Sequence, residues 1–168
     1  MKKLFVVLAA VLLLAIMACS SSKGDDVSSG NIGSAGGTIV SSDKNATLNV
    51  PAGALSNDTT ISIAESTEGD PPGAIAFSYI FTPDGLTFNS AVTVSLKYNT
   101  ELIPEGINET DLQLAYAQDG NWVPLANSTV DTTNHIISAP TNHFSTYATT
   151  CGTPLPYNSD PLSLRRLK

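Results

Sequence analysis

The feature that most constrains the fold is an alternation of apolar and polar residues with a period of two, which recurs from Gly36 onward. Successive side chains of a β-strand point to opposite faces of the sheet, so this pattern buries one face and leaves the other in water. The clearest stretches are "ATLNV", "TISIAE", "AVTVSLKY" and "DLQLAYA". No window shows apolar residues at helical spacing over three turns, so the pattern predicts an all-β, antiparallel fold.

Turn residues separate these stretches at short intervals, in "PAGA", "SND", "EGDPPG", "TPDG", "IPEG" and "QDG". Several short strands at regular spacing are typical of a β-sandwich. We therefore expect an antiparallel β-sandwich of about eight or nine strands between residues 38 and 149. The chain has 168 residues, which is enough for one domain with a proper core but not for two of ordinary size.

The first nineteen residues have the pattern of an export signal. Lys2 and Lys3 precede fifteen apolar residues, Leu4 to Ala18, which are fewer than the roughly 20 needed to span a bilayer as a helix. The sequence Ile16-Met17-Ala18-Cys19 then resembles the lipobox of bacterial lipoproteins. This resemblance implies that residues 1–18 are a signal peptide and that Cys19 carries lipid, including palmitate, as the first mature residue.

The charge of the processed chain narrows the choice of partners. Without residues 1–18, six basic residues face fifteen acidic ones, a net charge of −9. Nucleic acid and anionic headgroups would both repel such a domain. We expect contact with the membrane through the lipid on Cys19 and an unidentified protein partner. Ser20, not aspartate, follows Cys19, which by resemblance to enterobacterial sorting implies the outer membrane.

The two flanks of the predicted sandwich lack the strand pattern. Residues 19–37 are rich in serine and glycine and have few apolar side chains, which predicts a flexible tether. Residues 150–168 contain three prolines and are predicted to be a disordered tail. Near its end, Leu162, Leu164 and Leu167 stand beside three basic residues, which would suit a weak docking segment, although we expect a plain terminus. With Cys19 lipidated, Cys151 is expected to be a free thiol in the tail.

Three stretches of the chain carry a resemblance to a known domain family. "GGTIVSSDKNATLNVPAGALSNDTTISI" resembles the first half, and "FTPDGLTFNSAVTVSLKY" the second signature, of the ZU-five domain of zonula occludens proteins, netrin receptors and ankyrins. "NWVPL" and "HIISAPTNHFSTYA" resemble the closing strands of secreted bacterial relatives. The resemblance covers residues 36–148. It implies a β-sandwich that serves as a structural or interaction module without a cofactor.

The tripeptide His143-Phe144-Ser145 raises the question of self-cleavage. In some eukaryotic relatives of the ZU-five family the same three residues resemble a self-cleaving site. That resemblance implies Ser145 as the nucleophile, the Phe144 carbonyl as its target and His143 as the base. The reaction requires a strained peptide bond. In a regular strand, by contrast, Phe144 faces the core while His143 and Ser145 meet solvent, and this is the interpretation we favour.

Other site chemistry has little support in the sequence. Two histidines and scattered carboxylates form no zinc or EF-hand spacing, so we expect no metal. Acids in "EGDPPG" and "TPDG" leave a calcium site as an alternative, and carbohydrate binding is another. Trp122, the single tryptophan, is expected to pack in the core or against an edge. The sequence therefore predicts a non-catalytic interaction module, with self-cleavage and a calcium- or carbohydrate-binding adhesion module as alternatives.

Overall fold

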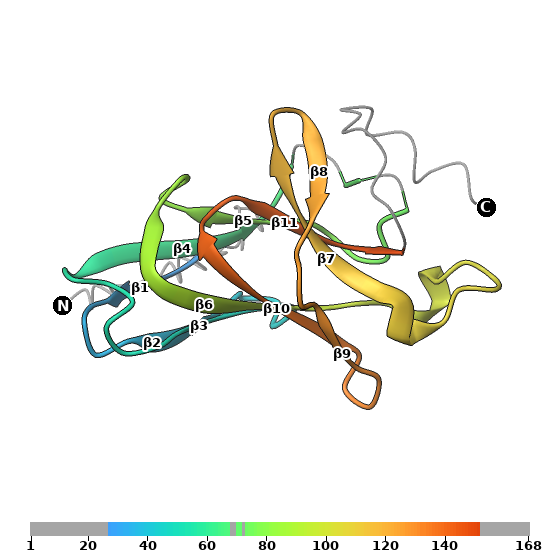
Figure 1. Cartoon of the computed structure of the whole chain (residues 1–168), viewed down its shortest axis with the longest axis horizontal. Helices are drawn as coiled ribbons and strands as arrows, with labels where there is room; N and C mark the ends of the chain where they lie inside the picture. Colours follow the sequence, from blue (N-terminus) through green and yellow to red (C-terminus); the bar gives the residue numbers. More distant parts are fainter. Residues whose placement is uncertain (1–26, 68–69, 72, 152–168) are drawn as a thin grey trace, which may run out of the picture.

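Two antiparallel sheets pack together in the computed structural model, which describes residues 27–67, 70–71 and 73–151 (Figure 1). The six-stranded sheet has the order β1 (Ser28–Ile32), β4 (Thr59–Glu65), β5 (Tyr79–Thr82), β11 (Thr146–Cys151), β7 (Leu112–Gln118), β8 (Asn121–Pro124). The five-stranded sheet has the order β2 (Gly37–Val40), β3 (Ala46–Val50), β6 (Thr87–Lys97), β10 (Ile136–His143), β9 (Thr129–Asp131). Two short 3-10 helices, η1 (Thr100–Leu102) and η2 (Glu109–Asp111), lie between β6 and β7. The predicted sandwich is confirmed, with more strands than the eight or nine expected.

The core follows the alternation in the sequence. Val92, Val94 and Leu96 of β6 are fully buried, and β6 lies at the centre of its sheet between β3 and β10. The inward-facing side chains of both sheets join in one apolar cluster. Each fully buried aliphatic side chain of this kind contributes roughly 1.5–3 kcal/mol relative to an exposed one.

The strand β7 departs from strict alternation, since Leu114 and Ala115 are adjacent and both fully buried. Leu114 faces the main core, whereas Ala115 packs with Trp122 and Ala148 in a small second cluster. Trp122 is buried, as its expected packing role requires. It is therefore not available as an exposed surface on which a sugar could stack.

The strand β1 corrects the expectation that all of residues 19–37 form a tether. Ser28–Ile32 pairs in register with β4 along its whole length, and Ile32 is buried in the core. Low apolar content did not exclude a strand here. An edge strand can form backbone hydrogen bonds with the neighbouring strand while it buries only one large side chain. The sandwich begins at β1 instead of residue 38.

The C-terminal boundary of the sandwich also differs from the prediction, because β11 runs to Cys151 instead of ending at residue 149. Cys151 is a free, half-buried thiol whose Sγ donates to the Gly73 carbonyl at 3.3 Å, so it belongs to the sandwich and not to the tail. The predicted signal peptide, Cys19 and residues 152–168 lie outside the described residues. Among the described residues, no helix has the length and apolar character needed to cross a membrane.

Candidate functional site

The tripeptide His143-Phe144-Ser145 lies where the chain passes from one sheet to the other. β10 of the five-stranded sheet ends at His143, and β11 of the six-stranded sheet begins at Thr146. The Phe144 N–H donates to the Leu86 carbonyl at 2.8 Å, and the Gly85 N–H donates to the Phe144 carbonyl at 3.3 Å. The expectation of one regular strand through this tripeptide is wrong, because the chain changes sheets there and its side chains no longer alternate.

The Phe144 ring is part of the core, as predicted. It is 1% exposed, and its centroid lies 5.7 Å from that of Phe81 and 4.9 Å from that of Phe88. Tyr147 is also fully buried and packs edge-on against Phe81. Strict alternation would have placed Phe144 and Tyr147 on opposite faces. The crossover between them brings both rings into the same core.

The His143 and Ser145 side chains contact different neighbours. The Ser145 hydroxyl is buried and donates to the Ala117 carbonyl at 2.6 Å. The half-buried His143 ring packs edge-on against Tyr116, with 4.9 Å between ring centroids. In the part of the chain that the structure describes, no hydrogen bond joins the imidazole to the Ser145 hydroxyl. The geometry therefore ties β11 to β7 and does not present the pairing of nucleophile and base that activates a serine.

A second hydroxyl secures the end of β10. The Tyr147 hydroxyl donates to the His143 carbonyl and shares a hydrogen bond of 3.1 Å with the Thr141 hydroxyl. Burial raises the pKa of Tyr147 to about 12. At neutral pH the phenol is therefore protonated and acts as the donor that holds the crossover in place.

The carboxylates do not form a cation site in the described ranges. No three His, Cys, Asp or Glu side chains there come together as ligands for a metal ion. Asp70 of "EGDPPG" instead accepts hydrogen bonds from the Ser78 N–H at 2.6 Å and the Ser78 hydroxyl at 2.8 Å. This contact fixes the loop before β5, which is the ordinary role of an aspartate in a turn.

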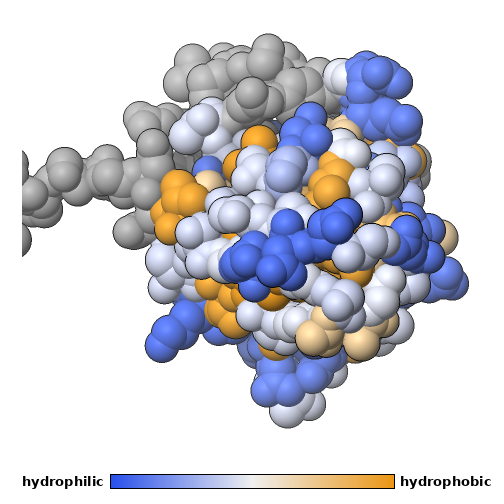
Figure 2. Space-filling model, turned by 90° about the vertical axis from the view of Figure 1, so that its left-hand side faces the viewer, coloured by the Kyte–Doolittle hydropathy of each residue, from blue (hydrophilic) through white to orange (hydrophobic). Residues whose placement is uncertain are grey.

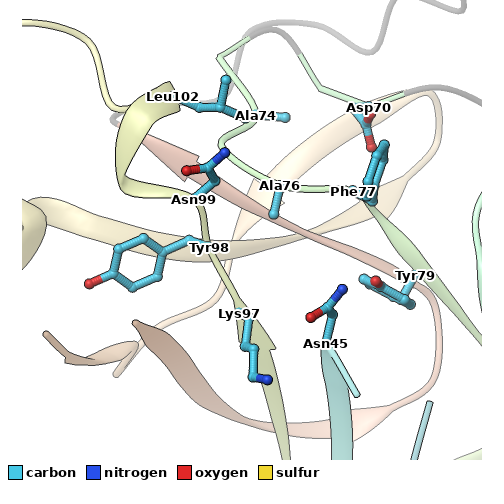
Figure 3. A pocket seen from close by; sticks show the side chains of 10 residues that line it. All are labelled: Asn45, Asp70, Ala74, Ala76, Phe77, Tyr79, Lys97, Tyr98, Asn99 and Leu102. Carbon is cyan, nitrogen blue, oxygen red and sulfur yellow. The ribbon is translucent and has the colours of Figure 1, made fainter. Parts of the chain in front are cut away.

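A site that the sequence did not indicate lies between the loop before β5 and the segment that follows β6. It is a mostly apolar cavity of about 330 Å³, called here the apolar hollow. Its apolar and aromatic lining is Ala74, Ala76, Phe77, Tyr79, Tyr98 and Leu102, and its polar lining is Asn45, Asp70, Lys97 and Asn99 (Figure 3). Small-ligand and side-chain pockets commonly combine an apolar interior with a few polar groups in this way.

The walls of the apolar hollow are held by backbone contacts. The Asn99 N–H donates to the Ile75 carbonyl at 2.9 Å, which joins the two walls. The Asn99 side chain also accepts from the Glu101 N–H at 3.0 Å and so caps η1, the element that carries Leu102. Phe77 is 55% exposed and Leu102 is 51% exposed. A fixed concave surface thus carries two large apolar side chains that the core does not use.

The sequence pattern gave only a weak signal for this surface. The stretch "GAIAFSYIF" is almost continuously apolar, so alternation alone did not show that Phe77 points outward while Ile75 and Tyr79 are buried. Leu102 lies in a 3-10 turn, where a strand pattern does not apply. The two segments meet only through the tertiary fold.

No family model matches this chain, and no relative was found among curated proteins.

Proposed function

We propose that this chain is a bacterial lipoprotein whose lipid-modified Cys19 anchors a non-catalytic β-sandwich in the cell envelope, where the sandwich binds a protein partner. The observation that carries the binding role is the apolar hollow, because Phe77 and Leu102 beside it are both more than half exposed. Exposed apolar side chains gathered at a concave site are typical of interaction surfaces. The resemblance to ZU-five interaction modules supports the same role.

The anchoring part of the proposal rests on Lys2, Lys3, the apolar run to Ala18, and Cys19. Labelling cells with a palmitate analogue should mark the chain, and Cys19→Ala should abolish both the label and removal of the signal peptide. Membrane fractionation should place the labelled protein in the outer membrane. An unlabelled wild-type chain would contradict the lipoprotein assignment.

The binding part is tested by photocrosslinking in intact cells. A photoreactive phenylalanine analogue at Phe77 should give a defined product with another protein, because this side chain lies on the apolar hollow. The same analogue at Val40 is the matched control, since Val40 of β2 is 43% exposed but does not line the hollow. Identical products from the two positions would show that the hollow has no special role.

Self-cleavage is a second candidate function, and one observation favours it. The Gly85 N–H already donates to the Phe144 carbonyl, where an oxyanion would develop. Ser145 Oγ would attack this carbonyl carbon, the Ser145 amine would leave to give an ester, and water would then release the two chains. The intact mass of the purified protein beside a Ser145→Ala variant tests this. A break before Ser145 that is absent in the variant would replace the non-catalytic assignment.

A further inference from the structure

We propose that the C-terminal segment of residues 162–168, "LSLRRLK", docks in the apolar hollow of its own chain. The proposal rests on the hollow being the binding surface described above and names an internal occupant for it. Such an occupant would compete with the external protein partner, which would have to displace it.

The place where β11 ends is the first argument. Thr150 forms an isolated β-bridge with Ala74, and the Cys151 N–H donates to the Gly73 carbonyl at 3.5 Å. Ala74 itself lines the apolar hollow. The chain therefore leaves the last strand at the rim of the hollow and not at a distant edge of the sandwich.

The length of the following chain is the second argument. Ten residues, 152–161, lie between Cys151 and Leu162. A flexible chain of ten residues spans on the order of 16–19 Å root-mean-square, which brings its far end to a site near its origin. A short linker of this kind gives an effective concentration in the millimolar range. Even a contact of low intrinsic affinity would then be occupied.

Complementary chemistry is the third argument. The segment offers three leucines for an apolar cavity and three cations, Arg165, Arg166 and Lys168. The described residues include eleven Asp and Glu but only two lysines, Lys44 and Lys97. Asp70 lines the hollow, and Glu101 is adjacent to Leu102 in η1. Lys97 also lines the hollow, so the attraction comes from the acidic surroundings and not from every lining residue.

The test is photocrosslinking of the purified full chain. With a photoreactive phenylalanine analogue at Leu102, we expect a crosslink to a peptide from residues 162–168 in a product that keeps the mass of one chain. The same analogue at Val40 should give at least several-fold less of this product. A tail crosslink found only in a product with the mass of two chains would overturn the intramolecular contact and indicate a second copy as the occupant.

Charge reversal provides the specific control. Arg165→Glu combined with Arg166→Glu should lower the Leu102 crosslink several-fold, whereas Lys23→Glu combined with Lys44→Glu makes the same change in net charge and should leave it unchanged. Equal loss in both variants would overturn recognition by the segment's own cations.

The outcome also separates this inference from the proposed function. If the analogue at Leu102 captures another protein in cells but never residues 162–168 in the pure chain, the internal occupant is overturned while the binding surface stands. If the pure chain gives the tail crosslink and no external partner is captured in cells, the docked segment stands and the proposed function fails.

Discussion

At the scale of single residues, the Asp43 carboxylate links the two sheets. Asp43 lies in the turn between β2 and β3 of the five-stranded sheet and accepts a hydrogen bond from the Tyr79 hydroxyl of β5 in the other sheet. It also accepts from the Ser41 hydroxyl and, at 3.0 Å, from the Asn45 N–H. Burial opposes ionisation, but these hydrogen bonds outweigh it and hold the pKa of Asp43 below its ordinary value of 3.8.

This depressed pKa gives a pH-dependent prediction. A carboxylate whose pKa is lower in the folded state stabilises the fold above its unfolded pKa, near 3.8, and this contribution is lost as pH falls through the folded pKa. Asp43 is itself exposed, so solvent screens part of this effect. Asp43→Asn should therefore lower the free energy of unfolding at pH 7 by about 0.5–1.5 kcal/mol, and the difference from wild type should shrink near pH 2. Urea unfolding of both proteins at pH 7 and near pH 2 measures this difference in the free energy of unfolding.

Asp131→Asn is the comparison for this prediction. Asp131 accepts hydrogen bonds only from its own turn, from Thr133 and Asn134, among the contacts that the structure describes. We expect a smaller loss than for Asp43→Asn, because no contact between sheets is broken. A loss for Asp131→Asn that equals that of Asp43→Asn would contradict the linking role of Asp43.

Phe144 provides a second prediction at this scale. Phe144→Ala should lower the free energy of unfolding by about 3–5 kcal/mol, because it leaves a cavity beside Phe81 and Phe88. Phe77→Ala removes the same atoms from a residue that is 55% exposed, so it should lower the free energy of unfolding by less than about 1 kcal/mol. Denaturant unfolding of the two variants measures the contrast. Similar losses would show that Phe144 is not a core residue.

At the scale of elements, the connection from β1 to β2 shows how a Ser/Gly-rich segment can be structural. The Gly36 N–H donates to the Gly33 carbonyl at 3.0 Å and closes a turn, and Gly36 has a φ of +73°. A Cβ at Gly36 would lie 2.3 Å from the Val50 carbonyl oxygen. The glycine permits both the left-handed backbone and the close approach of β3.

Two glycine substitutions separate these effects. Gly53 has a φ of +81°, but a Cβ added to it would meet nothing within 4 Å. Gly53→Ala should therefore lower the free energy of unfolding by about 1–2 kcal/mol, through the strain of the left-handed backbone alone. Gly36→Ala adds a clash with the Val50 carbonyl oxygen to the same backbone strain, so it should lower the free energy of unfolding by about 1–3 kcal/mol more than Gly53→Ala does. Thermal and urea unfolding test the difference. Equal losses would mean that β1 and β2 are not held as closely as described.

At the scale of the whole molecule, β1 shortens the distance between the proposed anchor and the sandwich. Only residues 20–27 separate Cys19 from Ser28, and eight residues reach at most roughly 26–29 Å when fully extended. Viewed from the end near β1 and β2, apolar side chains are scattered among polar ones, without one continuous apolar face (Figure 2). We therefore expect the membrane contact to be made by the lipid and not by the sandwich.

Energy transfer to a headgroup acceptor in lipid vesicles tests this geometry. In a Cys151→Ser background, a donor dye at Ser34→Cys, in the β1–β2 turn, should transfer more efficiently than one at Thr133→Cys. Thr133 lies in the β9–β10 hairpin, and β9 is the edge strand of the five-stranded sheet opposite β2 (Figure 1). Equal or reversed efficiencies would show that the sandwich is not suspended from its β1 end.

The sequence by itself determined the fold class, because the period of two is a local property that strand geometry imposes on each segment separately. It also predicted that Phe144 faces the core and that Trp122 packs in the core or against an edge, and both side chains are buried. The Phe144 prediction came from a regular strand that is absent at this position, so its burial is correct although the local structure differs. These predictions needed no knowledge of which strands are neighbours.

The tertiary structure decided the features that depend on neighbours. β1 is a strand because β4 lies beside it, and Ser145 is held by Ala117 because the chain changes sheets at Phe144. The apolar hollow exists because two loops far apart in the sequence meet at Ile75 and Asn99. Backbone hydrogen bonds between distant segments set these contacts, and they leave no periodic trace in the residues themselves.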